Sequence, residues 1–264
     1  RACSVVHAAS GRPVGDAGRR RVVLRRDRAS RSKKQAIKPW LSRQWCISKL
    51  DAEFLARMED LLDLYAKPYD AAEPVVCFDE KSVQLLGEVR EPLPASASHP
   101  ARHDYEYVRG GTANLLVALE PLAGWRDVAV TDQRTKVDFA HRMRFLALER
   151  YPDARVVHVV LDNLNTHTLG ALYEAFPATD ARRIARRLQF HPTPVHGSWL
   201  NMVEIENSVI ARACLARRIP TAQALRDVIR PWQDQRNAAN ARIEWRFSLD
   251  SARSKFDRFY PAKS

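Results

Sequence analysis

The chain has 264 residues, of which 45% are hydrophobic, and its formal net charge is +12. This length fits one large domain or a medium domain with a smaller appendage. The apolar content excludes a protein that is disordered or fibrous over most of its length. No apolar run approaches the roughly 18 residues of a membrane span, so we expect no membrane association. The four cysteines are scattered without metal or disulfide spacing, which favours a reducing, cytoplasmic location.

The positive charge is concentrated at the start of the chain. Residues 1–40 contain 12 Lys and Arg against Asp16 and Asp27, whereas the remainder has 31 against 29 acids. We expect residues 1–38 to form a basic, largely disordered arm that contacts phosphates. A solvated leader without any partner is the alternative. Because the first residue is Arg rather than Met, we expect a fragment, a processed chain or the product of a damaged gene.

The first predicted element lies in a linker region, residues 39–72. An amphipathic helix begins at Asp51 and ends at Pro68, because apolar residues recur on one stripe from Phe54 to Tyr65. We expect the folded domain to occupy residues 73–260. Five apolar segments in it are predicted as strands: 75–78, 114–119, 128–131, 156–161 and 188–191.

Turns and helices separate these strands. Residues 91–103 are predicted as a loop and 120–124 as a turn. Thr135 and Asp138 predict a capped helix that runs to about Arg150. Further helices are expected over 169–176, around the arginines at 182, 183, 186 and 187, over 199–215 with Ser198 as its cap, and after Thr221 with a kink at Pro231.

This order of elements predicts an α/β fold. A hairpin followed by strands that alternate with helices gives a mixed five-stranded sheet, antiparallel first and parallel later, flanked by helices. Asp79 and Asp162 each follow an apolar strand, and the carboxyl ends of strands are where open α/β sheets usually place their chemistry. Either aspartate alone would more often be a turn or cap residue.

A third carboxylate is expected on the helix that follows Ser198. Asn201, Glu204 and Ser208 are spaced i, i+3 and i+7, so they share one polar stripe. A solvated helix face is the ordinary explanation for Glu204 alone. Together with Asp79 and Asp162, however, it completes an all-carboxylate set that suits two Mg²⁺ or Mn²⁺ ions about 3.5–4 Å apart. The histidines are too dispersed for a zinc site: 141, 158, 167, 191 and 196.

Three segments resemble the signature blocks of bacterial DDE transposases, most closely those of the six-thirty insertion-sequence family within the mariner-like superfamily. They are VVCFDEKS at 75–82, VLDNLNTH at 160–167 and TPVHGSWLNMVEIE at 193–206, and the similarity runs from about Ser32 to the C-terminus. The resemblance implies a ribonuclease-H-like catalytic domain over residues 73–260. It implies that Asp79, Asp162 and Glu204 are the catalytic, metal-binding triad.

The same resemblance assigns supporting positions and partners. Positions that orient the triad or face DNA would be Glu80, Asn163, His167, His196 and Asn201. The implied activity is strand cleavage at the ends of a mobile element, followed by attack of the freed 3′-hydroxyl on target DNA. The expected partners are element ends, target DNA and a second subunit in a homodimer, in the bacterial nucleoid.

The N-terminal region differs from the family. No helix-turn-helix like that of the family precedes Ser32, so we expect the region that recognises element ends to be missing. Two alternatives therefore stay open: another ribonuclease-H-like metal nuclease without strand transfer, and a non-catalytic DNA-binding remnant of a decayed transposase.

The third block contains two glutamates, and only one can complete the triad. Glu204 and Glu206 are two positions apart on one helix, so about 200° separates their directions. The apolar stripe from Leu200 to Cys214 runs beside Glu204. We therefore expect Glu204 to face the sheet and Glu206 to face solvent or a neighbouring subunit.

Overall fold

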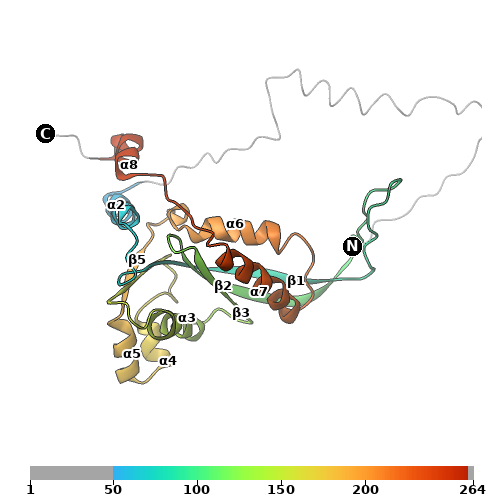
Figure 1. Ribbon diagram of the computed structural model, residues 1–264, viewed down its shortest axis with the longest axis horizontal. Helices are drawn as coiled ribbons and strands as arrows, with labels where there is room; N and C mark the ends of the chain where they lie inside the picture. The colour runs from blue at the N-terminus through green and yellow to red at the C-terminus, as the bar shows by residue number, and fades with distance from the viewer. Residues whose placement is uncertain (1–49, 261–264) are drawn as a thin grey trace, which may run out of the picture. The chain divides into compact units, whose positions relative to one another are not determined.

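The computed structural model describes residues 50–260 (Figure 1). The predicted arm over residues 1–38 and the beginning of the predicted linker lie outside the described residues, as do Cys3 and Cys46. Cys77 and Cys214 are buried free thiols. None of the described helices is long and apolar enough to cross a bilayer.

A mixed five-stranded sheet forms the centre of the fold, as predicted. Its strands are β1 (Val75–Glu88), β2 (Tyr107–Glu120), β3 (Trp125–Thr131), β4 (Val157–Leu161) and β5 (Leu188–Pro192). They lie in the order β3-β2-β1-β4-β5. The pairs β1–β2 and β2–β3 are antiparallel, and β1–β4 and β4–β5 are parallel. This is the ribonuclease-H-like arrangement.

The first two strands are much longer than the sequence predicts. β1 continues beyond Phe78 because β2 pairs with it from Cys77 opposite Leu119 to Glu88 opposite Tyr107. The parallel pairing of β1 with β4 stops at Cys77 and Val160. Asp79 therefore lies inside β1, at the point where its β4 neighbour ends, and the expectation that it follows the end of a strand is wrong.

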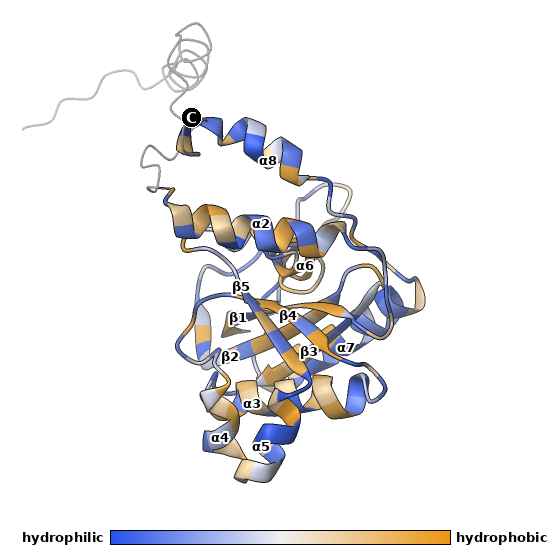
Figure 2. Ribbon diagram, turned by 90° about the vertical axis from the view of Figure 1, so that its left-hand side faces the viewer, coloured by the Kyte–Doolittle hydropathy of each residue, from blue (hydrophilic) through white to orange (hydrophobic). Residues whose placement is uncertain are grey.

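Helices cover both faces of the sheet (Figures 1 and 2). One face carries α3 (Lys136–Arg144), which continues as a π-helix over Phe145–Arg150, and then α4 (Gly170–Ala175) and α5 (Ala178–Ala185). The other face carries α2 (Ala52–Ala66), α6 (Val203–Ala213), α7 (Ala222–Ala238) and α8 (Leu249–Lys255).

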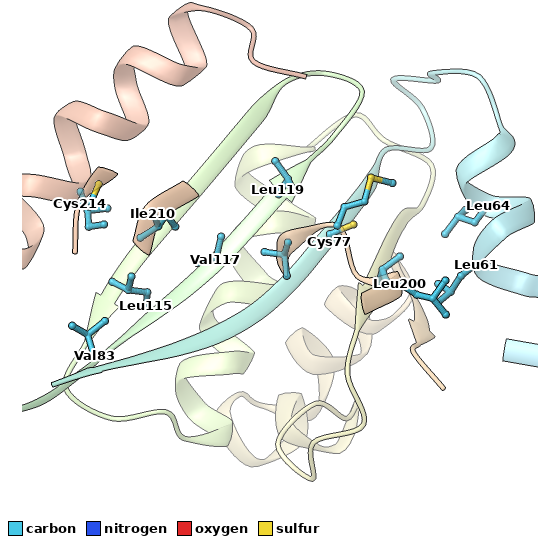
Figure 3. Packing of buried hydrophobic residues seen from close by; sticks show 14 of the residues in the cluster. Leu61, Leu64, Cys77, Val83, Leu115, Val117, Leu119, Leu200, Ile210 and Cys214 are labelled. Carbon is cyan, nitrogen blue, oxygen red and sulfur yellow. The ribbon is translucent and has the colours of Figure 1, made fainter. Parts of the chain in front are cut away.

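Each face has its own hydrophobic core, because side chains of a strand alternate between the two faces. Val76 and Phe78 belong to the α3–α5 core, and Cys77 belongs to the α2–α6–α7 core. Figure 3 shows the second core, in which Val117 and Leu119 of the sheet face Ile210 of α6.

Three predicted helix starts are confirmed by their caps. The side chain of Asp51 accepts a hydrogen bond from the Phe54 amide at 2.8 Å, and Thr135 and Asp138 form a reciprocal capping box. Thr221 caps α7, which continues through Pro231 to Ala238. In the β2–β3 turn Gly124 has φ +67, a conformation that favours glycine.

The predicted helix over 199–215 is wrong at its start. Ser198–Leu200 form a short 3₁₀ turn, and α6 begins at Val203. The chain is extended at Asn201, whose buried side chain bonds to the backbone of β1 rather than following a helix stripe. This tertiary contact replaces the expected Ser198 cap.

Candidate active site

The sheet register places the two predicted aspartates at the same level. Cys77 pairs with Val160 in the parallel β1–β4 ladder. Asp79 and Asp162 each lie two residues further along, after Cys77 and Val160 respectively. Cys77 and Val160 both belong to the α2–α6–α7 core. Since strand residues two apart share a face, Asp79 is directed toward the α6 side of the sheet, and Asp162 leaves β4 on that side.

Helix α6 is held against this part of the sheet by a buried amide. Asn201 is 2% exposed, and its Nδ2 donates to the carbonyl oxygen of Phe78 at 2.9 Å. Its Oδ1 accepts from the Val203 amide at 3.3 Å. The start of α6 is therefore tied to β1 directly beside Asp79.

The same helix contributes two side chains toward the aspartates. Asn207 is buried, and its Nδ2 donates to Oδ2 of Asp79 at 3.3 Å. Glu204 lies three residues before Asn207 and so shares its side of the helix. Unlike Asn207, Glu204 is exposed. The order along the helix therefore places Glu204 at the open edge of the site and Asn207 in its interior.

The charges of Asp162 and Glu204 act on Asp79. Burial, together with the negative charges of Glu204 and Asp162, raises the pKa of Asp79 to about 6, against the opposing effects of the hydrogen bond from the Glu80 amide and of the His167 charge. Within residues 50–260, no group of three His, Cys, Asp or Glu side chains is arranged closely enough to hold a metal ion. Metal ligation by Asp79, Asp162 and Glu204 stays a prediction.

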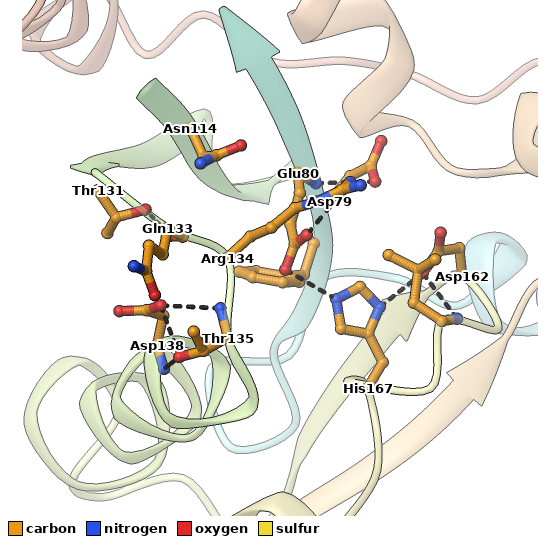
Figure 4. Close-up of polar contacts among 12 residues, drawn as sticks. Asp79, Glu80, Asn114, Thr131, Gln133, Arg134, Thr135, Asp138, Asp162 and His167 are labelled. Atoms are coloured by element: carbon orange, nitrogen blue, oxygen red, sulfur yellow. Dashed lines mark hydrogen bonds and ion pairs between the residues drawn. The ribbon is translucent and has the colours of Figure 1, made fainter. Parts of the chain in front are cut away.

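A histidine between two carboxylates lies next to the aspartates (Figure 4). Nδ1 of His167 is 2.5 Å from Oδ1 of Asp162, and its Nε2 is 3.3 Å from Oε1 of Glu80. Glu80 also faces the guanidinium of Arg134 at 3.9 Å. The ring of His167 packs against Phe139, with 4.8 Å between the ring centres.

His167 is a cation in this setting. Burial by itself lowers the pKa of His167, but the hydrogen bonds and charges of Asp162 and Glu80 outweigh burial and raise it to about 9. The imidazolium therefore neutralises part of the negative charge at neutral pH and fixes the Asp162 carboxylate in one orientation.

Of the remaining predicted residues, Asn163 makes hydrogen bonds beside the site, whereas His196 makes none to it among the described residues. Oδ1 of Asn163 accepts from Arg57 of α2 at 2.6 Å, and its Nδ2 donates to the carbonyl oxygen of Thr193. Asn163 thus holds the segment after β4 in place. His196 is exposed in a tight turn with φ +62 and makes no hydrogen bond to the triad within the described residues.

The expected orientation of Glu206 is wrong. Its side chain is fully buried and binds two arginines, Arg126 of β3 at 3.0 Å and Arg236 of α7 at 2.8 Å. The helix period correctly predicts that the side chains of Glu204 and Glu206 point in different directions. However, the side opposite the triad is covered by β3 and α7 instead of being open to solvent.

Sequence reasoning missed several of these contacts. Asn207 could have been found, because it is spaced i, i+3 from Glu204 on the same helix. Arg134 lies in a segment that resembles the family, but its partner Glu80 is far away in sequence. Nothing in the local pattern signals that Arg126 is buried, since it lies on a short strand next to the charged Asp127.

Comparisons with known proteins show the family of the chain. The sequence profile of a family described as DDE superfamily endonuclease matches residues 74–226. A solved Mos1 mariner paired-end complex with Mn is similar at 15% identity and a TM-score of 0.47, over 81% of this chain and 66% of that one. The solved catalytic domain of the Mos1 mariner transposase is similar at 12% identity and a TM-score of 0.48, over 77% and 99%.

The match to the longer Mos1 chains is incomplete. This chain spans 66% and 65% of the lengths of the Mos1 chains in the paired-end and strand-transfer complexes. A search of curated protein sequences gives no match.

Proposed function

The chain belongs to the DDE superfamily of endonucleases, and on this basis we propose that it is a transposase catalytic domain that cleaves DNA strands and joins them to target DNA. The observation that carries the proposal is the proximity of three carboxylates from β1, the end of β4 and α6: Asp79 and Asp162 lie at the same level of the sheet, and the charges of Asp162 and Glu204 both act on Asp79. The finer assignment to the six-thirty insertion-sequence family rests on the three sequence blocks that contain these residues.

The electrostatics of the site fit a divalent cation. The charges of Asp162 and Glu204 act on Asp79, and Glu80 adds a fourth carboxylate nearby; the described residues set His167 and Arg134 against these four negative charges. Such an excess of negative charge, with Asp79 and Asp162 half-buried and Glu204 exposed, favours a bound cation. Oxygen ligands without sulfur suit Mg²⁺ or Mn²⁺, and we propose Asp79, Asp162 and Glu204 as the residues that would hold two ions. Bound ions would supply acidity to the attacking oxygen and neutralise charge on the phosphate.

The chain's own residues orient the reactants. Asn207 and the Glu80 amide hold the two oxygens of Asp79 in place. His167 fixes Asp162, and Asn201 fixes α6 against β1. In the proposed reaction the oxygen of water, or later of a 3′-hydroxyl, forms a bond to phosphorus while the bond to the leaving oxygen breaks. The proton of the attacking group passes to solvent.

The proposal is tested by nicking of supercoiled plasmid. We expect cleavage with Mg²⁺ or Mn²⁺ and none in chelator. Asp79→Asn and Asp162→Asn should abolish cleavage while DNA binding persists. Asp63→Asn is the matched control, because Asp63 is an exposed carboxylate on α2. Full cleavage in chelator, or by Asp79→Asn, contradicts the proposal.

Strand joining is measured separately. A labelled duplex with a free 3′-hydroxyl should become covalently attached to plasmid DNA, and we propose that a homodimer holds two such ends. Cleavage without joining supports a metal nuclease of the same fold. DNA binding with neither reaction supports a non-catalytic remnant.

A further inference from the structure

A cluster of arginines lies on α5 and on the two residues that follow it, away from the predicted triad. Arg182, Arg183 and Arg186 are exposed, and together with Arg187, Ala178 and Thr179 they line a hollow on the surface. We call Arg182, Arg183 and Arg186 the α5 arginine surface. Much of α5 is hydrophilic in Figure 2, on the α3–α5 side of the sheet.

Few carboxylates offset this charge. Arg183 is 3.4 Å from Asp180, and both side chains are at least half exposed, so the pair is weak. Arg187 donates to the carbonyl oxygens of Tyr151 and Pro152, which is a structural contact. Within residues 50–260, neither Arg182 nor Arg186 forms an ion pair.

The arginines repel one another, although each is also attracted to the negative C-terminal end of α5. Arg182 and Arg186 are spaced i, i+4, and Arg183 and Arg186 are spaced i, i+3, so like charges are neighbours on the helix surface. Each such pair destabilises a helix by about 0.2–0.5 kcal/mol. An anion that binds several of these side chains at once would remove the repulsion.

The surface is well separated from the triad. The Val157 amide donates to the carbonyl oxygen of Arg187 at 2.7 Å, so the end of α5 lies where β4 and β5 begin. Asp162 follows the other end of β4, five residues later. At about 3.3 Å per strand residue this is about 16 Å along β4, and α5 also lies on the face of the sheet opposite α6, so the surface is more than roughly five base pairs of duplex from the triad.

We propose that the α5 arginine surface binds the phosphate backbone of duplex DNA several base pairs from the phosphate that is cleaved. The inference rests on the proposed function, which makes DNA the polyanion that this chain meets. Three flexible guanidinium groups in one hollow match a row of phosphates. Such contacts hold the duplex without reading its sequence.

The test uses the double variant Arg182→Gln/Arg186→Gln, because glutamine keeps the helix propensity while removing the charge. The matched control is Arg226→Gln/Arg230→Gln, which has the same spacing and charge change on exposed positions of α7, on the opposite face of the sheet. Binding of a 30-base-pair labelled duplex is measured by fluorescence anisotropy in chelator, from 50 to 200 mM salt. Thermal unfolding checks that both variants are folded.

We expect the α5 variant to bind DNA at least about tenfold more weakly at 100 mM salt. The slope of log K against log[salt] should become smaller in magnitude by about 1.8, because two phosphate contacts are lost. The α7 control should bind like the parent. Parental affinity and slope in the α5 variant, or an equal loss in the α7 control, would overturn the proposal. If the parent fails to cleave, the proposed function fails, but the binding comparison still decides the role of this surface.

Discussion

Replacing Glu206 by glutamine tests whether the two glutamates of α6 have different roles, with Glu206 stabilising the fold and Glu204 taking part in cleavage. Glu206 and Arg126 are both fully buried, 3.0 Å apart, and Arg236 binds the same carboxylate at 2.8 and 3.2 Å. Glu206→Gln leaves the charge of Arg126 without its counterion in the interior. Arg236 is 27% exposed and can turn toward water, so most of the penalty falls on Arg126.

We expect Glu206→Gln to lose much of its stability. Removing one partner of a buried ion pair costs about 3–5 kcal/mol in the free energy of unfolding. For a domain of 150–250 residues, each kcal/mol lowers the melting temperature by about 2–4 °C, so we expect a decrease of roughly 6–20 °C. Exposed Glu204 makes no such contact, and Glu204→Gln should stay within about 0.5 kcal/mol of the parent.

The assay combines urea and thermal unfolding in chelator with plasmid nicking in Mg²⁺. We expect Glu204→Gln to be stable and inactive. Glu206→Gln should be unstable but should cleave at a temperature where it is folded. A free energy of unfolding for Glu206→Gln within about 1 kcal/mol of the parent would refute the buried ion-pair role of Glu206, and DNA cleavage by Glu204→Gln would refute the catalytic role of Glu204.

Three further predictions concern pH and the basic segment. The pKa of His167 is raised to about 9 in the folded protein, so the protonated imidazole stabilises the metal-free fold fully below pH 6.5. This stabilisation, up to about 3 kcal/mol, is lost as the pH rises through 9. In His167→Gln, the free energy of unfolding in urea should no longer decrease over that pH range. Burial and the neighbouring His191 lower the pKa of His158, so stability should fall as pH drops below 6.5. His158→Gln should flatten that fall, whereas exposed His103→Gln should not. Deletion of residues 1–38, which carry 12 basic side chains, should weaken DNA binding equally for all sequences and lower its salt slope; loss of a sequence preference would contradict this.

Local sequence patterns determined the types and order of the elements. The apolar runs at 75–78 and 157–161 are buried strands, and Asp51, Thr135 and Thr221 cap helices. These features depend on neighbours a few residues away, such as a side-chain oxygen that meets an amide of the first helical turn. The mixed sheet follows from the order of the elements, because parallel neighbours need a helical crossover.

Only the tertiary structure decided the lengths of the long strands and the burial of charged side chains. β1 runs through Asp79 because β2 pairs along it, and the start of α6 is displaced because Asn201 bonds to β1. Glu206 is buried because β3 and α7 bring Arg126 and Arg236 to it from 80 residues before and 30 residues after. A helix period shows that Glu204 and Glu206 face different ways, but what lies on each side depends on residues remote in sequence, because burial is a property of packing between elements.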